Sequence, residues 1–284
     1  MWADEFVRRI EAQEVLGAIA ERVAPQINRL LRSDNETGRG AKNFLNGTWL
    51  GHPLHPVLTD VPIGAWTIAL LFDCISMDEA ADAAIAVGIA GALAAAITGI
   101  VDWSDTYGPA QRIGVAHATL NITGTAFYAA SLLCRKQNRR FGKFLSFAGY
   151  GILNAGAFLG GELVYGQQIG VNHAAAQELP TEFVAVLPEA ELRNDTLARV
   201  DAQGVPVLLV RRNGVIRGLL ETCSHLGGPL SEGTLEEGTV RCPWHGSRFC
   251  LENGAVMDGP ATHPQPRFEA RVKNGQIEIR AASS

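Results

Sequence analysis

Two short stretches near the C-terminal end decide the fold of the segment around them: residues 223–230, CSHLGGPL, and residues 242–249, CPWHGSRF. The first reads C-x-H and the second C-x-x-H, and sixteen residues separate His225 from Cys242. Each stretch offers one thiolate and one imidazole. Two loops folded against each other would therefore present two cysteines and two histidines, which are metal ligands.

This ligand set fits two kinds of metal centre. One is a Rieske [2Fe–2S] cluster, in which two histidines replace two cysteines on one of the two irons. The other is a tetrahedral Cys₂His₂ zinc site. Finger-type zinc sites carry their two histidines a few residues apart, late in a helix, whereas here each stretch mixes cysteine with histidine. We therefore expect the [2Fe–2S] cluster, with Cys223, His225, Cys242 and His245 as its ligands.

The segment around these stretches has a β pattern. Short pieces rich in β-branched residues are separated by turns, and Asn-Gly pairs at 213–214, 253–254 and 274–275 are strong signals for two-residue hairpins. We predict a small antiparallel all-β domain over residues 178–282 that carries both metal loops.

The preceding half of the chain is apolar. Four runs of about twenty residues, each long enough to cross a hydrocarbon core of about 30 Å as a helix, lie at 57–77, 81–101, 115–134 and 144–165. A soluble, alanine-rich helical bundle is the alternative. We predict a four-transmembrane-helix bundle over residues 43–172, with the lipid bilayer as its partner. Residues 1–42 are expected to form an N-terminal amphipathic helical segment, divided or bent at Pro25, and a linker.

Charge and cysteine content narrow the function classes. The net charge of −5 provides no broad basic field for nucleic acid. Five cysteines are too few for a disulfide scaffold. Cys74, Cys134 and Cys250 lie outside the metal loops in apolar or strand-like sequence, and we interpret them as core residues.

The C-terminal segment resembles the Rieske ferredoxins that feed electrons to bacterial ring-hydroxylating oxygenases. The resemblance rests on the CSHLGGPL and CPWHGSRF stretches and on Gly259-Pro260, which is similar to the proline loop of that family. It implies that Cys223 and Cys242 bind the inner iron, and that two histidines, His225 and His245, bind the outer one. The stretch 51–56, GHPLHP, together with the apolar runs, resembles an uncharacterised bacterial membrane family that is often fused to Rieske domains.

Four antiparallel spans place the histidines outside the β domain on one membrane face. These are His52 and His55 before the first span, His117 at the start of the third, and His173 after the fourth. Three interpretations stay open. The histidines are structural; or His55, His117 or His52 ligate a haem b; or they form a quinone pocket in which Asp60 or Asp102 orients the imidazole.

We expect a bacterial inner (plasma) membrane location. The basic residues between the third and fourth runs, at 135–143, favour the cytoplasm for this loop and the outside for the Rieske domain, whereas Arg39, Lys42 and Arg112 near the other face leave the opposite orientation open. We expect a membrane-bound one-electron carrier that exchanges electrons with a quinone, a haem or a reductase. A membrane-tethered redox sensor and a membrane-anchored ferredoxin component of an oxygenase system are the alternatives. Because no segment suits the non-haem iron domain of an oxygenase, an electron-transfer protein is favoured over a hydroxylase, and no catalytic residue is assigned.

Overall fold

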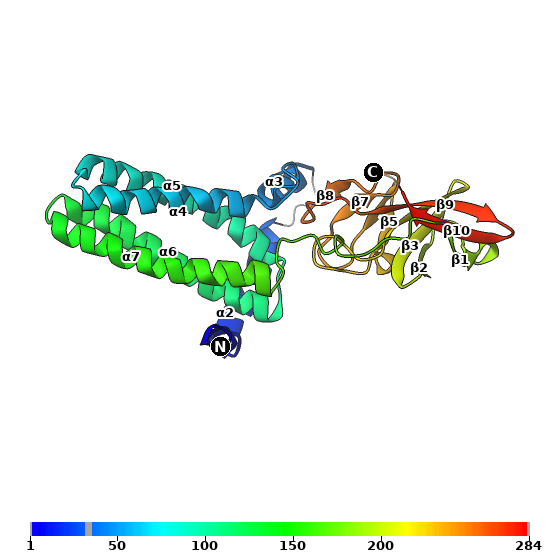
Figure 1. Ribbon diagram of the computed structural model, residues 1–284, viewed down its shortest axis with the longest axis horizontal. Coiled ribbons are helices and arrows are strands. Elements are labelled where there is room, and N and C mark those ends of the chain that lie inside the picture. The colour runs from blue at the N-terminus through cyan, green and yellow to red at the C-terminus, as the bar shows by residue number, and fades with distance from the viewer. Residues whose placement is uncertain (1, 32–35, 283–284) are drawn as a thin grey trace. The chain divides into compact units, whose positions relative to one another are not determined.

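The computed structural model describes residues 2–31 and 36–282, which divide into two compact units. The helical unit contains the described residues up to 38 and residues 53–169, and the β unit contains residues 39–52 together with the described segment that begins at Gly170. Figure 1 labels helices and strands of both units.

Six of the helices build the helical unit. They are α1 (Trp2–Glu11), α2 (Glu14–Leu31), α4 (Leu54–Cys74), α5 (Asp78–Ser104), α6 (Gly108–Arg135) and α7 (Arg139–Gly161), which continues as a π-helical turn (Glu162–Gly166). Of the two effects expected at Pro25, a bend or a division, the division does not occur, because Pro25 lies inside α2 and the N-terminal segment is interrupted at residues 12–13. The expected linker is also shorter: α3 (Glu36–Asn46) is helical, and residues 33–35 lie outside the described residues.

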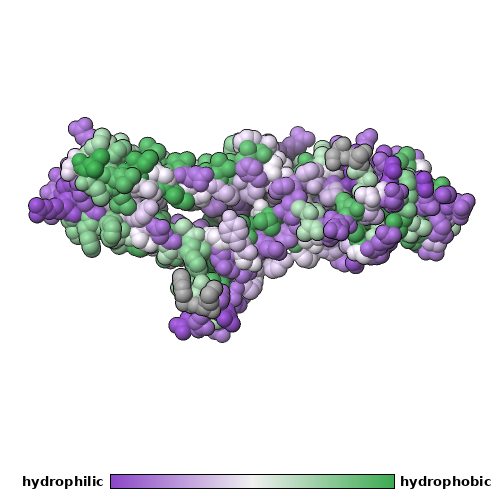
Figure 2. All heavy atoms as spheres, in the orientation of Figure 1, coloured by the Kyte–Doolittle hydropathy of each residue, from purple (hydrophilic) through white to green (hydrophobic). Residues whose placement is uncertain are grey.

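Three of the described helices are long and apolar enough to cross a membrane: α4, α5 and α7 with its extension. Their apolar side chains face outwards, as in Leu71 (61% exposed), Leu93 (60%) and Phe147 (71%). Figure 2 shows the resulting apolar surface on the helical unit. An outer surface of this kind is suited to lipid. The helix α6 lies where the third span was expected, but it is more polar and does not meet the same criterion.

The four long helices form two similar hairpins, because α4 packs mainly on α5 and α6 mainly on α7. Positions separated by about sixty residues correspond, and corresponding residues meet each other. Trp66 stacks on Tyr128, its equivalent, with ring centroids 4.4 Å apart and ring planes 4° apart. Residues that contact their own equivalents lie near an approximate two-fold axis. We therefore interpret the four long helices as two copies of one hairpin.

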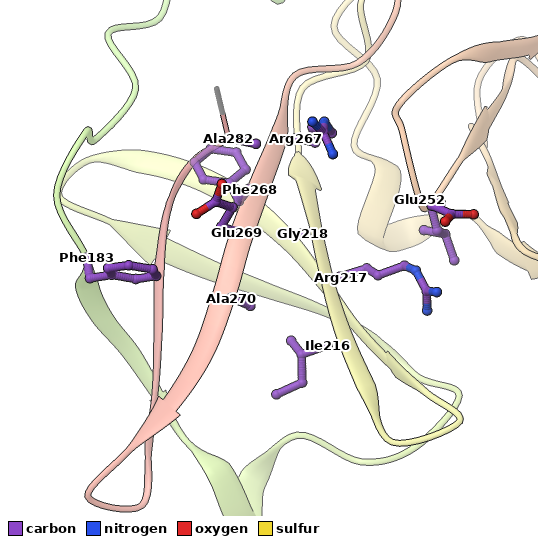
Figure 3. A pocket seen from close by; sticks show the side chains of 11 residues that line it. Phe183, Ile216, Arg217, Gly218, Glu252, Arg267, Phe268, Glu269, Ala270 and Ala282 are labelled. Carbon is purple, nitrogen blue, oxygen red and sulfur yellow. The ribbon is translucent and has the colours of Figure 1, made fainter. Parts of the chain in front are cut away.

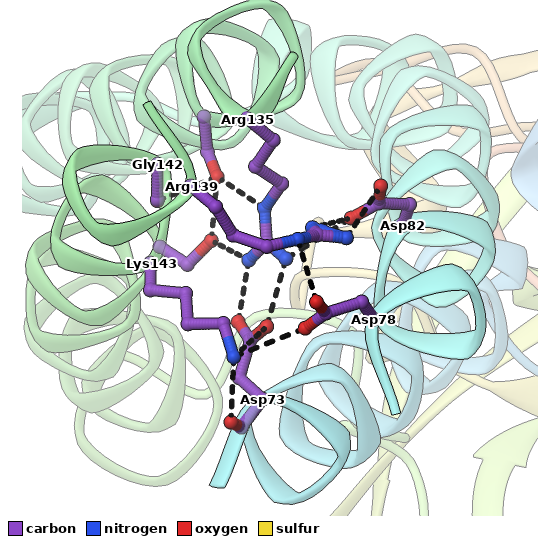
Figure 4. A network of polar contacts seen from close by, with 9 residues as sticks. Asp73, Asp78, Asp82, Arg135, Arg139, Gly142 and Lys143 are labelled. Atoms are coloured by element: carbon purple, nitrogen blue, oxygen red, sulfur yellow. Dashed lines mark hydrogen bonds and ion pairs between the residues drawn. The ribbon is translucent and has the colours of Figure 1, made fainter. Parts of the chain in front are cut away.

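The ends of the hairpins are joined by charges at corresponding positions. The hairpin α4–α5 contributes Asp73, Asp78 and Asp82, and α6–α7 contributes Arg135, Arg139 and Lys143 at the corresponding positions (Figure 4). Asp73 pairs with Arg135 and Asp78 with Arg139, whereas Asp82 pairs with both arginines and Lys143 pairs with Asp78. The Arg135 side chain is 1% exposed and bonds Asp73 with both terminal nitrogens. Its Nη1 also donates to Asp82 Oδ1 at 3.0 Å. A buried charge is tolerated only when it is paired in this way.

The β unit contains two antiparallel sheets. The larger has the order β1-β10-β9-β4-β3-β2 and is formed by β1 (Val184–Pro188), β2 (Leu197–Ala202), β3 (Val205–Arg212), β4 (Val215–Leu220), β9 (Arg267–Lys273) and β10 (Gln276–Ala281). The smaller has the order β5-β6-β7-β8 and is formed by β5 (Thr234–Glu236), β6 (Thr239–Arg241), β7 (Arg248–Cys250) and β8 (Val256–Asp258).

The strand β3, which lies between β4 and the edge strand β2, is buried on both faces. Val207 and Leu209 enter one apolar core, whereas Leu208 and Val210 enter a second core that also contains Cys223 and Cys242. Two of the three expected Asn-Gly turns have positive φ at both positions, at 213–214 and 274–275. At 253–254 only the glycine does.

Candidate metal centre

The two metal loops leave different sheets and meet at the second apolar core. The first loop follows β4, and the second connects β6 to β7. Cys223 and Cys242 are both buried, with 1% and 4% of their surfaces exposed. His225 and His245 are half-buried, so the sulfur side of the site is enclosed and the imidazole side is nearer the surface.

Each loop is closed by an equivalent set of backbone hydrogen bonds. The Cys223 N–H donates to Gly228 O at 2.9 Å, and the Cys242 N–H donates to Ser247 O at 2.8 Å. In the opposite direction, the Gly227 and Gly246 N–H groups donate to the cysteine carbonyls. These two glycines have φ of 78° and 80°, which residues with a Cβ rarely adopt. The repeated turn holds each cysteine in the same local geometry.

Two of the four side chains, Cys242 and His225, have pKa values shifted towards the protonation state that binds metal. A hydrogen bond from Cys223 lowers the pKa of Cys242 to about 7 and raises the pKa of Cys223. Burial, with a smaller contribution from His245, lowers the pKa of His225 to about 3. Thiolate and neutral imidazole are the protonation states that bind metal.

The geometry fits a two-iron cluster. The His225 and His245 rings lie edge to face with centroids 5.1 Å apart, and the buried Nδ1 of His225 has no hydrogen-bond partner. The described residues contain no group of three or more histidine, cysteine and acidic side chains placed to hold one metal ion. One cysteine pair and one histidine pair match the ligand set of a Rieske centre, in which each pair binds one of two irons.

Residues distant in sequence hold the first loop. Gln265 accepts from the Ser224 N–H at 3.1 Å and donates to Leu220 O at 2.7 Å. His173 N–H donates to Ser224 O at 3.1 Å. The second loop is fixed by Ser247, whose Oγ accepts from the Ala261 N–H at 2.9 Å. No motif in the sequence singled out Gln265 for this role.

The helix α3 supplies a further support that the sequence did not reveal. Asn43 accepts from the Gly259 N–H at 2.9 Å and donates to Asp258 Oδ1 at 2.9 Å. It thereby fixes the Gly259-Pro260 loop, which leads through Ala261 to Ser247. Residues 39–52 belong to the β unit because of such contacts. The separation of 215 residues explains why local patterns could not show this pairing.

We expect Asn43→Ala to destabilise the β unit by about 1–3 kcal/mol, because the Gly259 N–H loses its acceptor. Thermal loss of visible cluster absorbance in the full-length protein measures the change. Thr37→Ala, an exposed position on the same helix, is the matched control. Equal melting curves for the two variants would contradict the supporting role of Asn43.

The histidines expected on one membrane face are divided between the units. His55 and His117 come together in the helical unit with ring centroids 6.4 Å apart. His52 and His173 belong to the β unit, where the charge of His52 contributes, after burial, to a lowered pKa of His263. Asp60 is exposed, and His55 bonds a backbone carbonyl.

A hollow of about 370 Å³ lies on the larger sheet of the β unit (Figure 3). Phe183, Arg217, Glu252 and Arg267 are among its lining residues. It is lined by none of the cysteines or histidines of the metal loops, so it is separate from the candidate metal centre.

Comparison with known proteins agrees with this division. The family described as Rieske [2Fe-2S] domain matches residues 182–269, and the family described as Predicted membrane protein (DUF2231) matches residues 51–173. Apoptosis-inducing factor 3 of Mus musculus is 36% identical over 92 residues, which cover 32% of this chain. The chain spans 15% of the length of that relative.

Two smaller relatives are covered almost completely. Ferredoxin CarAc of Metapseudomonas resinovorans is 33% identical over 98 residues, or 34% of this chain and 92% of the relative. The 3-phenylpropionate/cinnamic acid dioxygenase ferredoxin subunit of Escherichia coli (strain K12) is 34% identical over 32% of this chain and 87% of the relative. A solved complex of reduced oxygenase and oxidized ferredoxin in carbazole 1,9a-dioxygenase matches with 29% identity and a TM-score of 0.34, over 36% of this chain and 95% of that one.

Over nearly their whole length, the ferredoxin relatives are similar in sequence to the segment that carries both metal loops. The chain therefore belongs to the Rieske [2Fe-2S] family, with its Rieske domain following a membrane domain of the DUF2231 type.

Proposed function

We propose that this protein is a membrane-bound one-electron carrier whose [2Fe–2S] cluster is held by Cys223 and Cys242 on one iron and by His225 and His245 on the other. One observation carries the proposal. A buried cysteine pair and a less buried histidine pair lie together on two loops that are closed by the same pattern of backbone hydrogen bonds. When bound, the cluster supplies reversible one-electron chemistry.

The chain's own residues fit an electron-transfer role. The buried cysteines exclude water from one side, while His245 and the half-exposed Trp244 lie nearer the surface, where a partner can approach. The hydrogen bonds that fix Ser224 and Ser247 keep the loops in place. A rigid site needs little rearrangement when its charge changes.

The membrane half is proposed to span with all four long helices, although α6 is the most polar of them. Its threonine hydroxyls are satisfied within the helix: Thr119, Thr123 and Thr125 each donate to the carbonyl four residues earlier at 2.8 Å. A helix whose polar groups are paired internally is tolerated in lipid. The basic residues at 135–143 favour the cytoplasmic side of a bacterial inner membrane for that end.

A turnover experiment tests the carrier. In native membrane vesicles containing the full-length chain, the paramagnetic-resonance signal of the reduced cluster should rise within seconds of NADH addition and fall when air is readmitted. A redox sensor would equilibrate with the NADH pool slowly and without net electron flux. A signal that develops over tens of minutes would therefore contradict the carrier and favour the sensor.

A second candidate is a membrane-anchored ferredoxin component of an oxygenase system. It is favoured by the similarity to a dioxygenase ferredoxin subunit, of which 87% is covered. The two functions differ in the acceptor, which is a quinone or haem for the first and an oxygenase for the second.

A further inference from the structure

The His55 and His117 rings are held in the same way by the two hairpins. His55 Nδ1 lies 2.8 Å from Ala95 O on α5, and His117 Nδ1 lies 2.8 Å from Gly156 O on α7. A carbonyl oxygen only accepts, so Nδ1 carries the proton in both rings. The Nε2 atom of each neutral ring then keeps its lone pair, which is the arrangement found in metal-bound histidines.

A glycine makes room for each ring. A Cβ at Gly99 would lie 2.7 Å from His55 Cε1, and a Cβ at Gly160 would lie 3.1 Å from His117 Cε1. Each glycine follows the carbonyl partner of its histidine by four residues, one turn along the same helix. Each hairpin therefore contains the same arrangement of a histidine, the backbone carbonyl that accepts from it and the glycine beside its ring. This repetition distinguishes a built site from a chance contact.

The distance between the rings suits one metal placed between them. An imidazole nitrogen lies about 1.2 Å from its ring centroid and a metal–imidazole bond is about 2.0 Å, so two imidazoles on opposite sides of one metal have centroids about 6.4 Å apart. The observed centroids are 6.4 Å apart, with the rings at 83° to each other. Asn121 Nδ2 donates to the His117 carbonyl oxygen at 2.8 Å and lies 3.3 Å from both ring nitrogens of His117, so it would leave Nε2 when a metal binds there.

We propose that His55 and His117 are the two axial ligands of a haem b in the helical unit. Two histidines are a ligand set that suits a haem, because its macrocycle supplies the other ligands of the iron. The helices of different hairpins contact each other far less than those within a hairpin, and Figure 2 shows an opening between α4–α5 and α6–α7. Cofactor sites in helical bundles are built from side chains on facing helices.

A quinone fits this pair less well. A quinone oxygen accepts a hydrogen bond, and each neutral ring has already donated its Nδ1 proton to a backbone carbonyl. Neither ring retains a second N–H for a quinone. The haem site is independent of the cluster in the β unit, so the two can be lost separately.

The test uses the full-length protein, produced with added 5-aminolaevulinate and purified in detergent. We expect stoichiometric haem by the pyridine haemochrome assay. His55→Ala and His117→Ala should each lose it while the cluster signal stays unchanged. His52→Ala, the matched control, should retain haem. Gly99→Leu should also lose haem because its side chain displaces the His55 ring, and it preserves both histidines.

Three results would overturn the proposal. The first is a wild-type protein that binds no haem even after hemin is titrated into it, while its cluster signal is intact. The second is full haem retention in His117→Ala. The third is quinone in the lipid extract of the wild type that disappears from His55→Ala, which would assign the pair to a quinone instead.

Discussion

Replacing Cys223 by serine should eliminate the cluster, with complete loss of the visible absorbance and of the paramagnetic-resonance signal of the reduced protein. In the proposed assignment the Cys223 thiolate binds the cluster, and a serine hydroxyl does not replace it at neutral pH. His245→Ala should give the same loss from the other side of the site. Iron content of the purified full-length variants gives a second measurement that does not depend on spectra.

Cys250→Ser provides the control for this experiment. Cys250 is a half-buried free cysteine on β7, eight residues after Cys242, and it lies outside both metal loops. This variant should keep the iron and the spectrum. If Cys223→Ser or His245→Ala retained a wild-type signal, the ligand assignment would be wrong, and the sulfur and imidazole pairs would need another explanation.

Removing the buried guanidinium in Arg135→Met should destabilise the helical unit by about 3–5 kcal/mol, since it leaves a buried carboxylate without its partner. Asp73 is 7% exposed and receives both terminal nitrogens of Arg135. Its nearest remaining cation, Lys143, has its Nζ 3.8 Å away. Thermal unfolding in detergent, followed by tryptophan fluorescence, measures the change.

The matched control is Arg9→Ala in the same unit. Arg9 and Glu5 form an exposed pair, with side chains 74% and 56% exposed, whose loss should cost no more than about 1 kcal/mol. Comparable losses of thermal stability in Arg135→Met and Arg9→Ala would contradict a larger contribution from the buried pair of Asp73 and Arg135. Because Asp73 and Arg135 occupy corresponding positions, the exchange Asp73→Arg with Arg135→Asp should recover part of the stability.

The β unit could be predicted further than the helical unit because its signals are local. The Cys-x-His and Cys-x-x-His stretches and the Asn-Gly turns act over a few residues, and they located the metal loops and two hairpin turns. Gln265 and Asn43 could not be found in this way. Their partners are 41 and more than 200 residues away, and an isolated glutamine or asparagine carries no chemical signature.

In the helical unit, the length of the apolar runs located the long helices, but it did not show that α4–α5 and α6–α7 are similar hairpins. Topology alone grouped four histidines, whereas the structure pairs His55 with His117 and assigns His52 and His173 to the β unit. The signal that was missed is the recurrence of His, an aromatic residue and a charge at about sixty-residue spacing. This recurrence is a weak signal because most lipid-facing positions need only be apolar. The two hairpins can therefore differ at most positions and still have the same structure.

The opposite charges at the ends of the two hairpins have a consequence for how such a unit arises. A hairpin duplicated within one chain begins with two identical surfaces, and each copy pairs equally well with its sister or with a neighbouring molecule. Once one copy carries Asp73, Asp78 and Asp82 and the other carries Arg135, Arg139 and Lys143, like pairs repel and the sister pair attracts. The charges thus commit the duplicated halves to each other and make the pairing internal to one chain.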